Sequence, residues 1–124
     1  MKFDGQVALV TGAGKGLGRA YALWLAQRGA AIVVNNRTHP GAPSSAQAVV
    51  AEIVKGGGRA VAAEYPVDDE AGARATVDAA YEAFGRLDIL ICNAGSRPQL
   101  KPFDETPVAQ IRDTICAKDR KSVV

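Results

Sequence analysis

The chain has 124 residues, of which 48% are hydrophobic, so it is long enough to form one globular domain with a real core. Its 15 basic and 13 acidic residues are interspersed and give a net charge of +2, which indicates neither a nucleic-acid nor a membrane surface. No apolar run approaches the roughly 18 residues of a membrane span, and the polar first residues have no signal-peptide character. We therefore expect a cytoplasmic protein. Cys92 and Cys116 lack metal or redox spacing, so we expect reduced thiols and no metal site.

Apolar strand patterns alternate with amphipathic helix patterns along the chain, which predicts an α/β fold. The first strand runs from Val7 to Thr11, and a helix from about Gly16 to Arg28 follows it. This helix places four large apolar residues on one face, namely Leu17, Tyr21, Trp24 and Leu25. The second strand covers residues 31–35, and the proline-containing segment 37–44 is a loop.

The second half of the predicted fold repeats the alternation. A helix capped by Ser44 or Ser45 runs to Lys55, and residues 59–64 form the third strand. A further helix begins at Asp68 or Asp69 and runs to Phe84. The apolar stripe of this helix is Ala73, Val77, Ala80, Tyr81 and Phe84. Residues 87–92 form the fourth strand, and a last helix is marked by Val108, Ile111 and Ile115. Right-handed crossovers then predict the strand order 3-2-1-4.

Glycines follow the first strand directly, in the run Gly12-Ala13-Gly14-Lys15-Gly16-Leu17-Gly18. A strand that opens through glycines into a helix is typical of a phosphate-binding turn, because glycine brings backbone N–H groups close to an anion. The positive end of the helix dipole adds to the attraction. We therefore expect a dinucleotide ligand, with contacts from Gly12, Gly14, Lys15, Gly16, Leu17 and Gly18.

The spacing of these glycines is neither the general dinucleotide fingerprint nor a Walker loop. The spacing instead fits the motif Thr-Gly-x-x-x-Gly-x-Gly, with Thr11, Gly12, Gly16 and Gly18 at its fixed positions. A second motif, Asn93-Ala94-Gly95, follows the fourth strand. In these motifs the chain resembles the short-chain dehydrogenase/reductase family over residues 7–117. The runs Gly18–Leu23 and Val33–Asn36 are most similar to the dehydrogenase domains of peroxisomal multifunctional enzymes.

The resemblance implies a Rossmann-type, doubly wound parallel sheet over residues 1–117, with a polar tail at 118–124, and a nicotinamide dinucleotide cofactor. Both motif loops leave the carboxyl ends of strands one and four, where the chain direction reverses. Ligands of open α/β sheets bind at such switch points. We therefore expect Asn93, Ala94 and Gly95 to share one cofactor site with the glycine turn.

The end of the second strand bears on the choice between NAD and NADP. A carboxylate there accepts the ribose hydroxyls and repels a 2′-phosphate. Here the position is the neutral Asn36, followed by Arg37, and Lys15 adds a second cation. Two cations converging on one phosphate explain both residues, so we expect NADP to be preferred over NAD. The alternative is that both are solvated surface charges.

The resemblance also implies an aspartate after the third strand that contacts adenine. Pro66 takes its place here, which leaves Val67 or Asp68 as a substitute, and Asp68 is equally a candidate helix cap.

The catalytic residues that the resemblance implies are absent from this chain. Family members use a Tyr, a Lys four residues later, a Ser and an Asn, because the phenol must lose its proton near neutral pH. No tyrosine of the chain, Tyr21, Tyr65 or Tyr81, is followed four residues later by a Lys. Ser122 cannot be the catalytic Ser, because the chain before it is too short for the helix and fifth strand that should precede that residue. The position of the Asn is occupied by Lys118. We therefore expect no catalytic residue, and a cofactor-binding half truncated before the fifth strand that does not catalyse alone.

Three functions from different classes remain open. The first is an oxidoreductase represented by its cofactor-binding half, and the second is a non-catalytic module that binds NADP. The third is an interaction protein that associates with itself or with a longer relative through the last helix and the exposed edge of the fourth strand.

Overall fold

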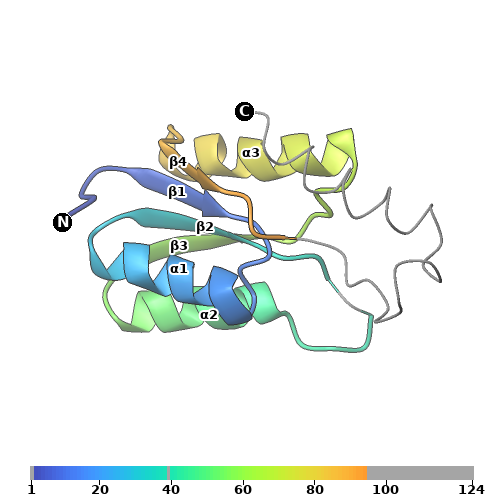
Figure 1. Ribbon diagram of the computed structural model, residues 1–124, viewed down its shortest axis with the longest axis horizontal. Coiled ribbons are helices and arrows are strands. Elements are labelled where there is room, and N and C mark those ends of the chain that lie inside the picture. Colours follow the sequence, from blue (N-terminus) through green and yellow to red (C-terminus); the bar gives the residue numbers. More distant parts are fainter. Residues whose placement is uncertain (1, 39, 95–124) are drawn as a thin grey trace, which may run out of the picture.

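A parallel sheet with helices on both faces forms the core of the molecule, as the computed structural model shows for residues 2–38 and 40–94 (Figure 1). Its elements are β1 (Val7–Val10), α1 (Gly16–Gln27), β2 (Ala31–Asn35), α2 (Ser45–Lys55), β3 (Arg59–Ala63), α3 (Glu70–Phe84) and β4 (Ile89–Ile91). The strands lie in the order β3-β2-β1-β4, which confirms the predicted fold and strand order. Gly95, the expected last helix and the expected tail lie outside the described residues.

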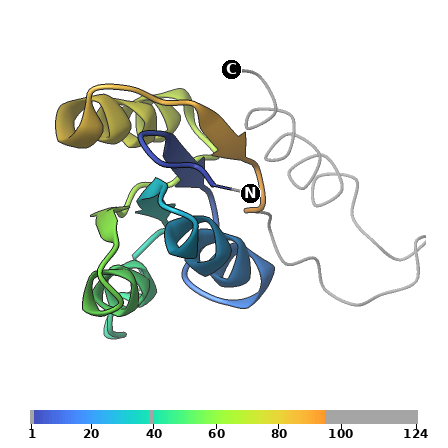
Figure 2. The same cartoon turned by 90° about the vertical axis from the view of Figure 1, so that its left-hand side faces the viewer.

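Three layers result, with α1 and α2 on one face of the sheet and α3 on the other (Figures 1 and 2). Every residue of β1 and β2 is buried, because these central strands are covered on both faces. One core cluster lies under α1 and α2 and includes Ile32, Val34 and Val49. The other lies under α3 and includes Leu9, Val33 and Ala80.

Helix α1 packs on the sheet through a different face from the one that the sequence predicted. Its buried residues are Gly18, Ala22 and Leu25, so only Leu25 of the four predicted residues is buried. The other three side chains are exposed, at 66% for Leu17, 40% for Tyr21 and 44% for Trp24. The small residues at 18 and 22 share the helical spacing of the core face and let the helix backbone approach the sheet closely.

The Trp24 ring lies against other side chains at the surface. Its centroid is 5.9 Å from that of Phe3, and the Arg28 guanidinium carbon lies 3.7 Å from it. An aromatic ring that packs at a tilt against a neighbouring ring and lies next to a cation is stabilised without entering the core.

Helix α3 follows its predicted stripe in part, because Ala80 is buried and Val77 and Phe84 pack against the core cluster under this helix. Its buried residues are Gly72, Thr76 and Ala80, and Tyr81 is exposed. The Asp69 side chain accepts a hydrogen bond from the Gly72 N–H at 2.6 Å, so the helix cap is Asp69 and not Asp68. Helix α2 begins similarly, with the Ser44 hydroxyl accepting from the Gln47 N–H at 3.1 Å.

Asp88 joins the start of β4 to the start of β1. Its carboxylate accepts hydrogen bonds from the Arg86 guanidinium and, at 2.8 Å, from the Val7 N–H. The hydrogen bond from Arg86 and then that from Val7 lower the pKa of Asp88 below its usual range.

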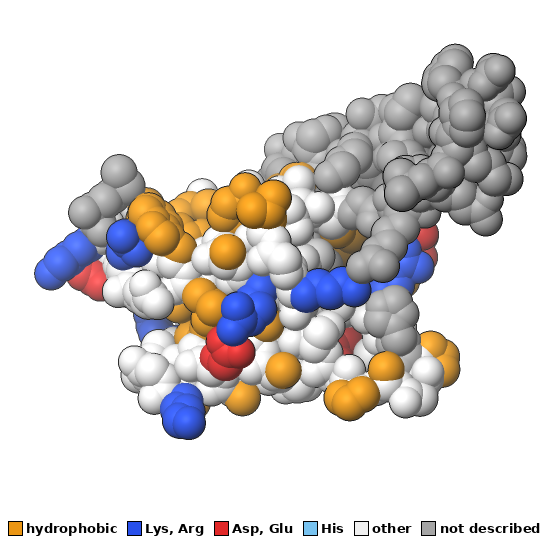
Figure 3. Space-filling model, turned by 60° about the horizontal axis from the view of Figure 1, so that its bottom comes forward, with side chains coloured by type: hydrophobic (Ala, Val, Ile, Leu, Met, Phe, Trp, Pro, Cys, Tyr) orange, Lys and Arg blue, Asp and Glu red, His pale blue; other side chains and the backbone are white. Residues whose placement is uncertain are grey.

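The face formed by α1 and α2 carries basic and acidic side chains side by side (Figure 3). One pair on these helices is Arg19 and Glu52, whose nitrogen and oxygen atoms lie 2.6 Å apart. The hydrogen bond to Glu52 raises the pKa of Arg19 above its usual value. This mixture of signs agrees with the local, interspersed charge of the sequence.

Candidate cofactor site

The two motif loops that follow β1 and β4 are bonded to each other. The Thr11 hydroxyl oxygen accepts hydrogen bonds from the backbone N–H groups of Asn93 and Ala94, each at 3.0 Å. The Asn93 side-chain amide donates to the Gly12 carbonyl oxygen at 3.2 Å. Parallel pairing of β1 with β4 places both loops at the carboxyl edge of the sheet. The structure thus brings together the two motifs that lie about eighty residues apart in the sequence.

Two of the glycines are required by this close approach. A Cβ atom at Gly12 would lie 2.8 Å from the Ala94 Cα atom, and the residue has a positive φ of 63°. A Cβ atom at Gly18 would lie 2.6 Å from the Asn93 side-chain nitrogen and closer still to the Gly12 carbonyl. Real Cβ atoms do not approach other atoms so closely, so a side chain at either position would push the loops apart.

Gly14 has a different neighbour, the end of β2. A Cβ atom there would lie 2.7 Å from the Asn36 side-chain nitrogen and would also clash with the Ser45 hydroxyl. The Asn36 amide donates to that hydroxyl at 2.5 Å. Asn36 is therefore held between the glycine turn and the start of α2. The sequence predicts Ser45 only as a candidate helix cap, and the structure adds its contact with Asn36.

The N-terminus of α1 has no side-chain cap. Its N-cap residue, Lys15, makes no capping hydrogen bond, and the first turn contains no acidic residue, in contrast to α2 and α3. Gly16 has a positive φ of 62° and no atom within 4 Å of the place of a Cβ atom. Uncapped N–H groups beside an open glycine fit an anion such as a pyrophosphate. Leu17 is exposed beside them.

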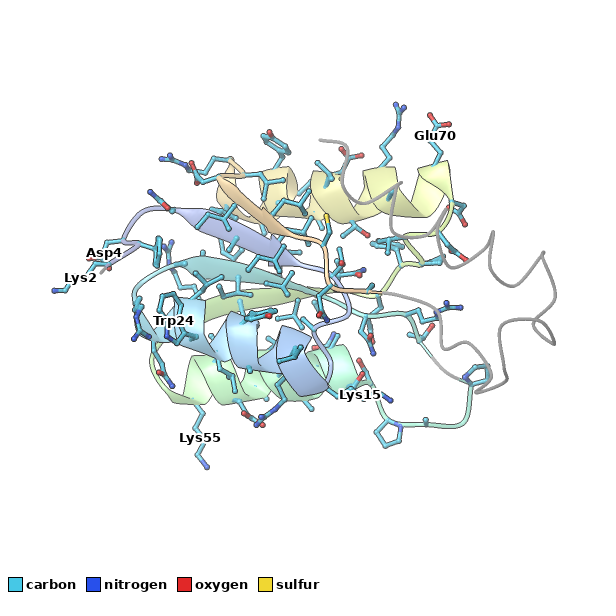
Figure 4. All side chains as sticks on the ribbon, viewed as in Figure 1. Lys2, Asp4, Lys15, Trp24, Lys55 and Glu70 are labelled. Carbon is cyan, nitrogen blue, oxygen red and sulfur yellow. The ribbon has the colours of Figure 1, made fainter. Side chains whose placement is uncertain are left out.

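The two cations expected at the site are both exposed. Neither Lys15 nor Arg37 forms an ion pair within residues 2–38 and 40–94. Lys15 lies at the start of α1, well away from Lys2 and Asp4 (Figure 4). A carboxylate that the sequence did not single out, Glu64, follows β3 and accepts a hydrogen bond from the Ser44 hydroxyl.

The loop from β3 to α3 distinguishes the two candidates for the adenine contact. Val67 is buried in the core, whereas Asp68 is exposed. Asp68 is therefore the side chain of the pair that a ligand can reach. The sequence did not single out the buried Asn35, whose side chain donates to the carbonyl oxygens of Ala63 and Tyr65 at the start of this loop.

A cleft of about 780 Å³ lies at the opposite, amino edge of the sheet. Its lining includes Lys2, Asp4, Arg28 and Arg59, and none of the predicted site residues. Among the described residues, no cluster of side chains could hold a metal ion, and no helix is long and apolar enough to cross a membrane.

Comparison with known proteins identifies the family. A family model of short chain dehydrogenases matches residues 6–118. The chain belongs to the short-chain dehydrogenase family. It is 53% identical over 100 residues to the peroxisomal multifunctional enzyme type 2 of Drosophila melanogaster, covering 77% of this chain and 16% of that enzyme. It is 50% identical over 93 residues to the peroxisomal hydratase-dehydrogenase-epimerase of Neurospora crassa, covering 75% of this chain and 9% of that protein.

A solved structure agrees with this membership. The crystal structure of a short chain dehydrogenase from Mycobacterium avium matches this fold with a TM-score of 0.83 and 41% identity. The match covers 92% of this chain and 42% of that chain, so this chain spans less than half the length of that relative. Membership implies a nicotinamide dinucleotide as the cofactor, and the bonded loops and uncapped helix at the carboxyl edge fit such a ligand.

Proposed function

We propose that this chain binds NADP(H) at the carboxyl edge of its sheet, as the cofactor-binding half of an enzyme that transfers hydride between nicotinamide and an alcohol or carbonyl compound. The observation that carries the proposal is the pairing of the Thr11 and Asn93 loops beside the uncapped start of α1. The proposed ligands are Gly12, Gly14, Lys15, Gly16, Leu17, Gly18, Asn36, Arg37, Asp68, Asn93, Ala94 and Gly95.

The preference for NADP over NAD is supported by the charges at the end of β2. Asn36, the residue after β2, is neutral, so the position where a carboxylate would oppose a 2′-phosphate carries no charge. Its amide is bonded to Ser45. Arg37 and Lys15 are exposed cations without ion-pair partners in the described part of the chain. A phosphate would supply both with a partner.

Titration of the purified chain with NADPH and NADH tests this preference. Removing one charge-assisted contact in Arg37→Ala should cost about 1.5–3 kcal/mol of NADPH binding and leave NADH binding nearly unchanged. Arg59→Ala is the matched control, because Arg59 is an exposed arginine that lines the opposite cleft. Equal affinities of the parent chain for the two cofactors would refute the preference.

When bound, the nicotinamide accepts or donates the hydride, and the residues proposed here hold and orient the dinucleotide. The 124 residues contain no Tyr-x-x-x-Lys, so we propose that this chain alone does not turn over substrate. General acid–base catalysis contributes about 10²–10⁴-fold to such reactions. Absorbance at the nicotinamide band, with secondary alcohols, ketones and 3-hydroxyacyl thioesters, is the assay. Turnover that persists after repurification and disappears in Gly16→Val would contradict the proposal.

A second candidate function is association through the edge of β4. Within the described residues, β4 pairs with β1 alone, and its residues Ile89, Leu90 and Ile91 are half-buried. A partly exposed apolar strand edge is a template for pairing with another chain. Analytical ultracentrifugation over a concentration series tests self-association. A sedimentation coefficient that rises with concentration supports it, and a monomer throughout contradicts it.

A further inference from the structure

Asn35, the last residue of β2, joins three separate segments of the molecule. Its side chain is buried, at 1% exposure, and its amide nitrogen donates to the carbonyl oxygens of Ala63 at 2.9 Å and Tyr65 at 3.0 Å. The same nitrogen lies 3.4 Å from the Thr76 hydroxyl on α3. Its own backbone carbonyl accepts from the Ala13 N–H at 2.8 Å. One buried residue thus contacts the glycine turn, the end of β3 with its loop, and α3.

An amide suits this position because of its donors. Val33, two residues earlier, lies in the core cluster under α3, so the position itself belongs to an apolar face. An apolar side chain at 35 would take the donors away from two carbonyl groups that leave the sheet there. A carboxylate would place oxygen acceptors against those same oxygens. Buried polar groups that lose their partners are destabilised, so the hydrogen bonds of Asn35 constrain where the chain runs after Ala63.

The segments that Asn35 joins are two sides of the proposed cofactor site. Ala13 lies between Gly12 and Gly14 in the glycine turn, and Tyr65 comes three residues before Asp68 in the loop proposed to face adenine. Because the Asn35 side chain is buried, it contacts the residues of the loop after β3 and not a bound ligand.

We propose that Asn35 is a positioning residue of the cofactor site: its side-chain amide holds the β3–α3 loop relative to the glycine turn, which is bonded to the backbone carbonyl of the same residue, and so sets the spacing that the adenine half of the dinucleotide requires. This inference rests on the proposed NADP(H) binding. It predicts that the Asn35 hydrogen bonds change ligand affinity in a protein that is still folded, which a role in stability alone does not.

Three variants separate positioning from stability. Asn35→Ser retains one hydroxyl donor and Asn35→Ala retains none, while both leave a cavity of similar size. Val33→Ala is the matched control, because it opens a cavity on the same strand without removing a hydrogen bond. Adenosine 2′,5′-bisphosphate, which carries the adenine half of NADP, is the probe, and calorimetry measures its Kd. Circular dichroism and urea denaturation report the folded fraction of each variant.

We expect Asn35→Ala to weaken the folded protein's binding of the probe about tenfold, the equivalent of one buried hydrogen bond. Asn35→Ser should recover part of this loss, and Val33→Ala should bind like the parent chain. If Asn35→Ala does not fold, Asn35→Ser against Val33→Ala decides the question. Parental affinity in the Asn35 variants, or an equal loss in Val33→Ala, would overturn the positioning role. If the parent chain binds neither NADPH nor the probe, the proposed function itself fails, and the inference fails with it.

Discussion

Gly16→Val should abolish cofactor binding and leave the chain folded. Gly16 has a φ of 62°, and no atom lies within 4 Å of the place of its Cβ. The added Cβ atom therefore meets no clash, and the left-handed backbone conformation costs about 1–2 kcal/mol for an L-residue. A domain with about 5–15 kcal/mol of stability tolerates that loss.

Binding should respond far more strongly than folding. A branched side chain at residue 16 stands in front of the N–H groups at the start of α1, where the pyrophosphate would approach. Each charge-assisted hydrogen bond lost costs about 1.5–3 kcal/mol, so losing even one weakens binding about ten- to hundredfold.

The assay is titration of NADPH, followed by its fluorescence, with circular dichroism to confirm the fold. Gly57→Val is the matched control, because Gly57 also has a positive φ, of 90°, and open space around it, but lies in the opposite cleft. It should lose similar stability and keep full affinity. Retained binding in Gly16→Val, or equal loss in Gly57→Val, would show that the glycine turn serves only the architecture.

Three further predictions concern the contacts that hold the site. Thr11→Val removes the acceptor of the Asn93 and Ala94 N–H groups and should lower the free energy of unfolding by about 1–3 kcal/mol in urea denaturation, whereas Thr11→Ser should not. Gly18→Ala should lower the melting temperature, because its Cβ would meet the Asn93 amide at 2.6 Å; an unchanged melting temperature would contradict the packing. Because the pKa of Asp88 is lower in the folded than in the unfolded chain, the ionised carboxylate stabilises the fold at pH values above its unfolded pKa. The parent chain should therefore exceed Asp88→Asn in free energy of unfolding by the largest amount at pH 7, and this difference should shrink as the pH falls below about 4. A difference that does not change with pH would refute that assignment.

The fold could be predicted from the sequence because its central strands are continuous apolar runs separated by glycines and prolines. The buried face of α1 could not. On α1, Leu17, Tyr21 and Trp24 have the same helical spacing as Gly18, Ala22 and Leu25, and hydrophobicity alone favours the larger set. The helix backbone packs closely on the sheet, which favours the small residues Gly18 and Ala22, and a hydrophobic pattern does not indicate such close packing.

The site shows a similar division. The two motifs could be placed together, since the carboxyl ends of neighbouring parallel strands meet at one edge. Asn35 and the contact of Ser45 with Asn36 could not be foreseen, because their partners are set by tertiary structure. Asn35 reaches across 28 to 41 residues, and in the sequence it is an ordinary polar residue at the end of a strand.

Backbone chemical shifts recorded by nuclear magnetic resonance during titration with NADPH test the central claim most directly. The changes should be largest at the amides of residues 12–18 and of Asn93 and Ala94, on the carboxyl edge of the sheet. The chemical shifts of amides around the amino-edge cleft, such as those of Lys2 and Gly57, should not change. Changes centred on that cleft, or none at saturating NADPH, would contradict a dinucleotide site at the paired loops.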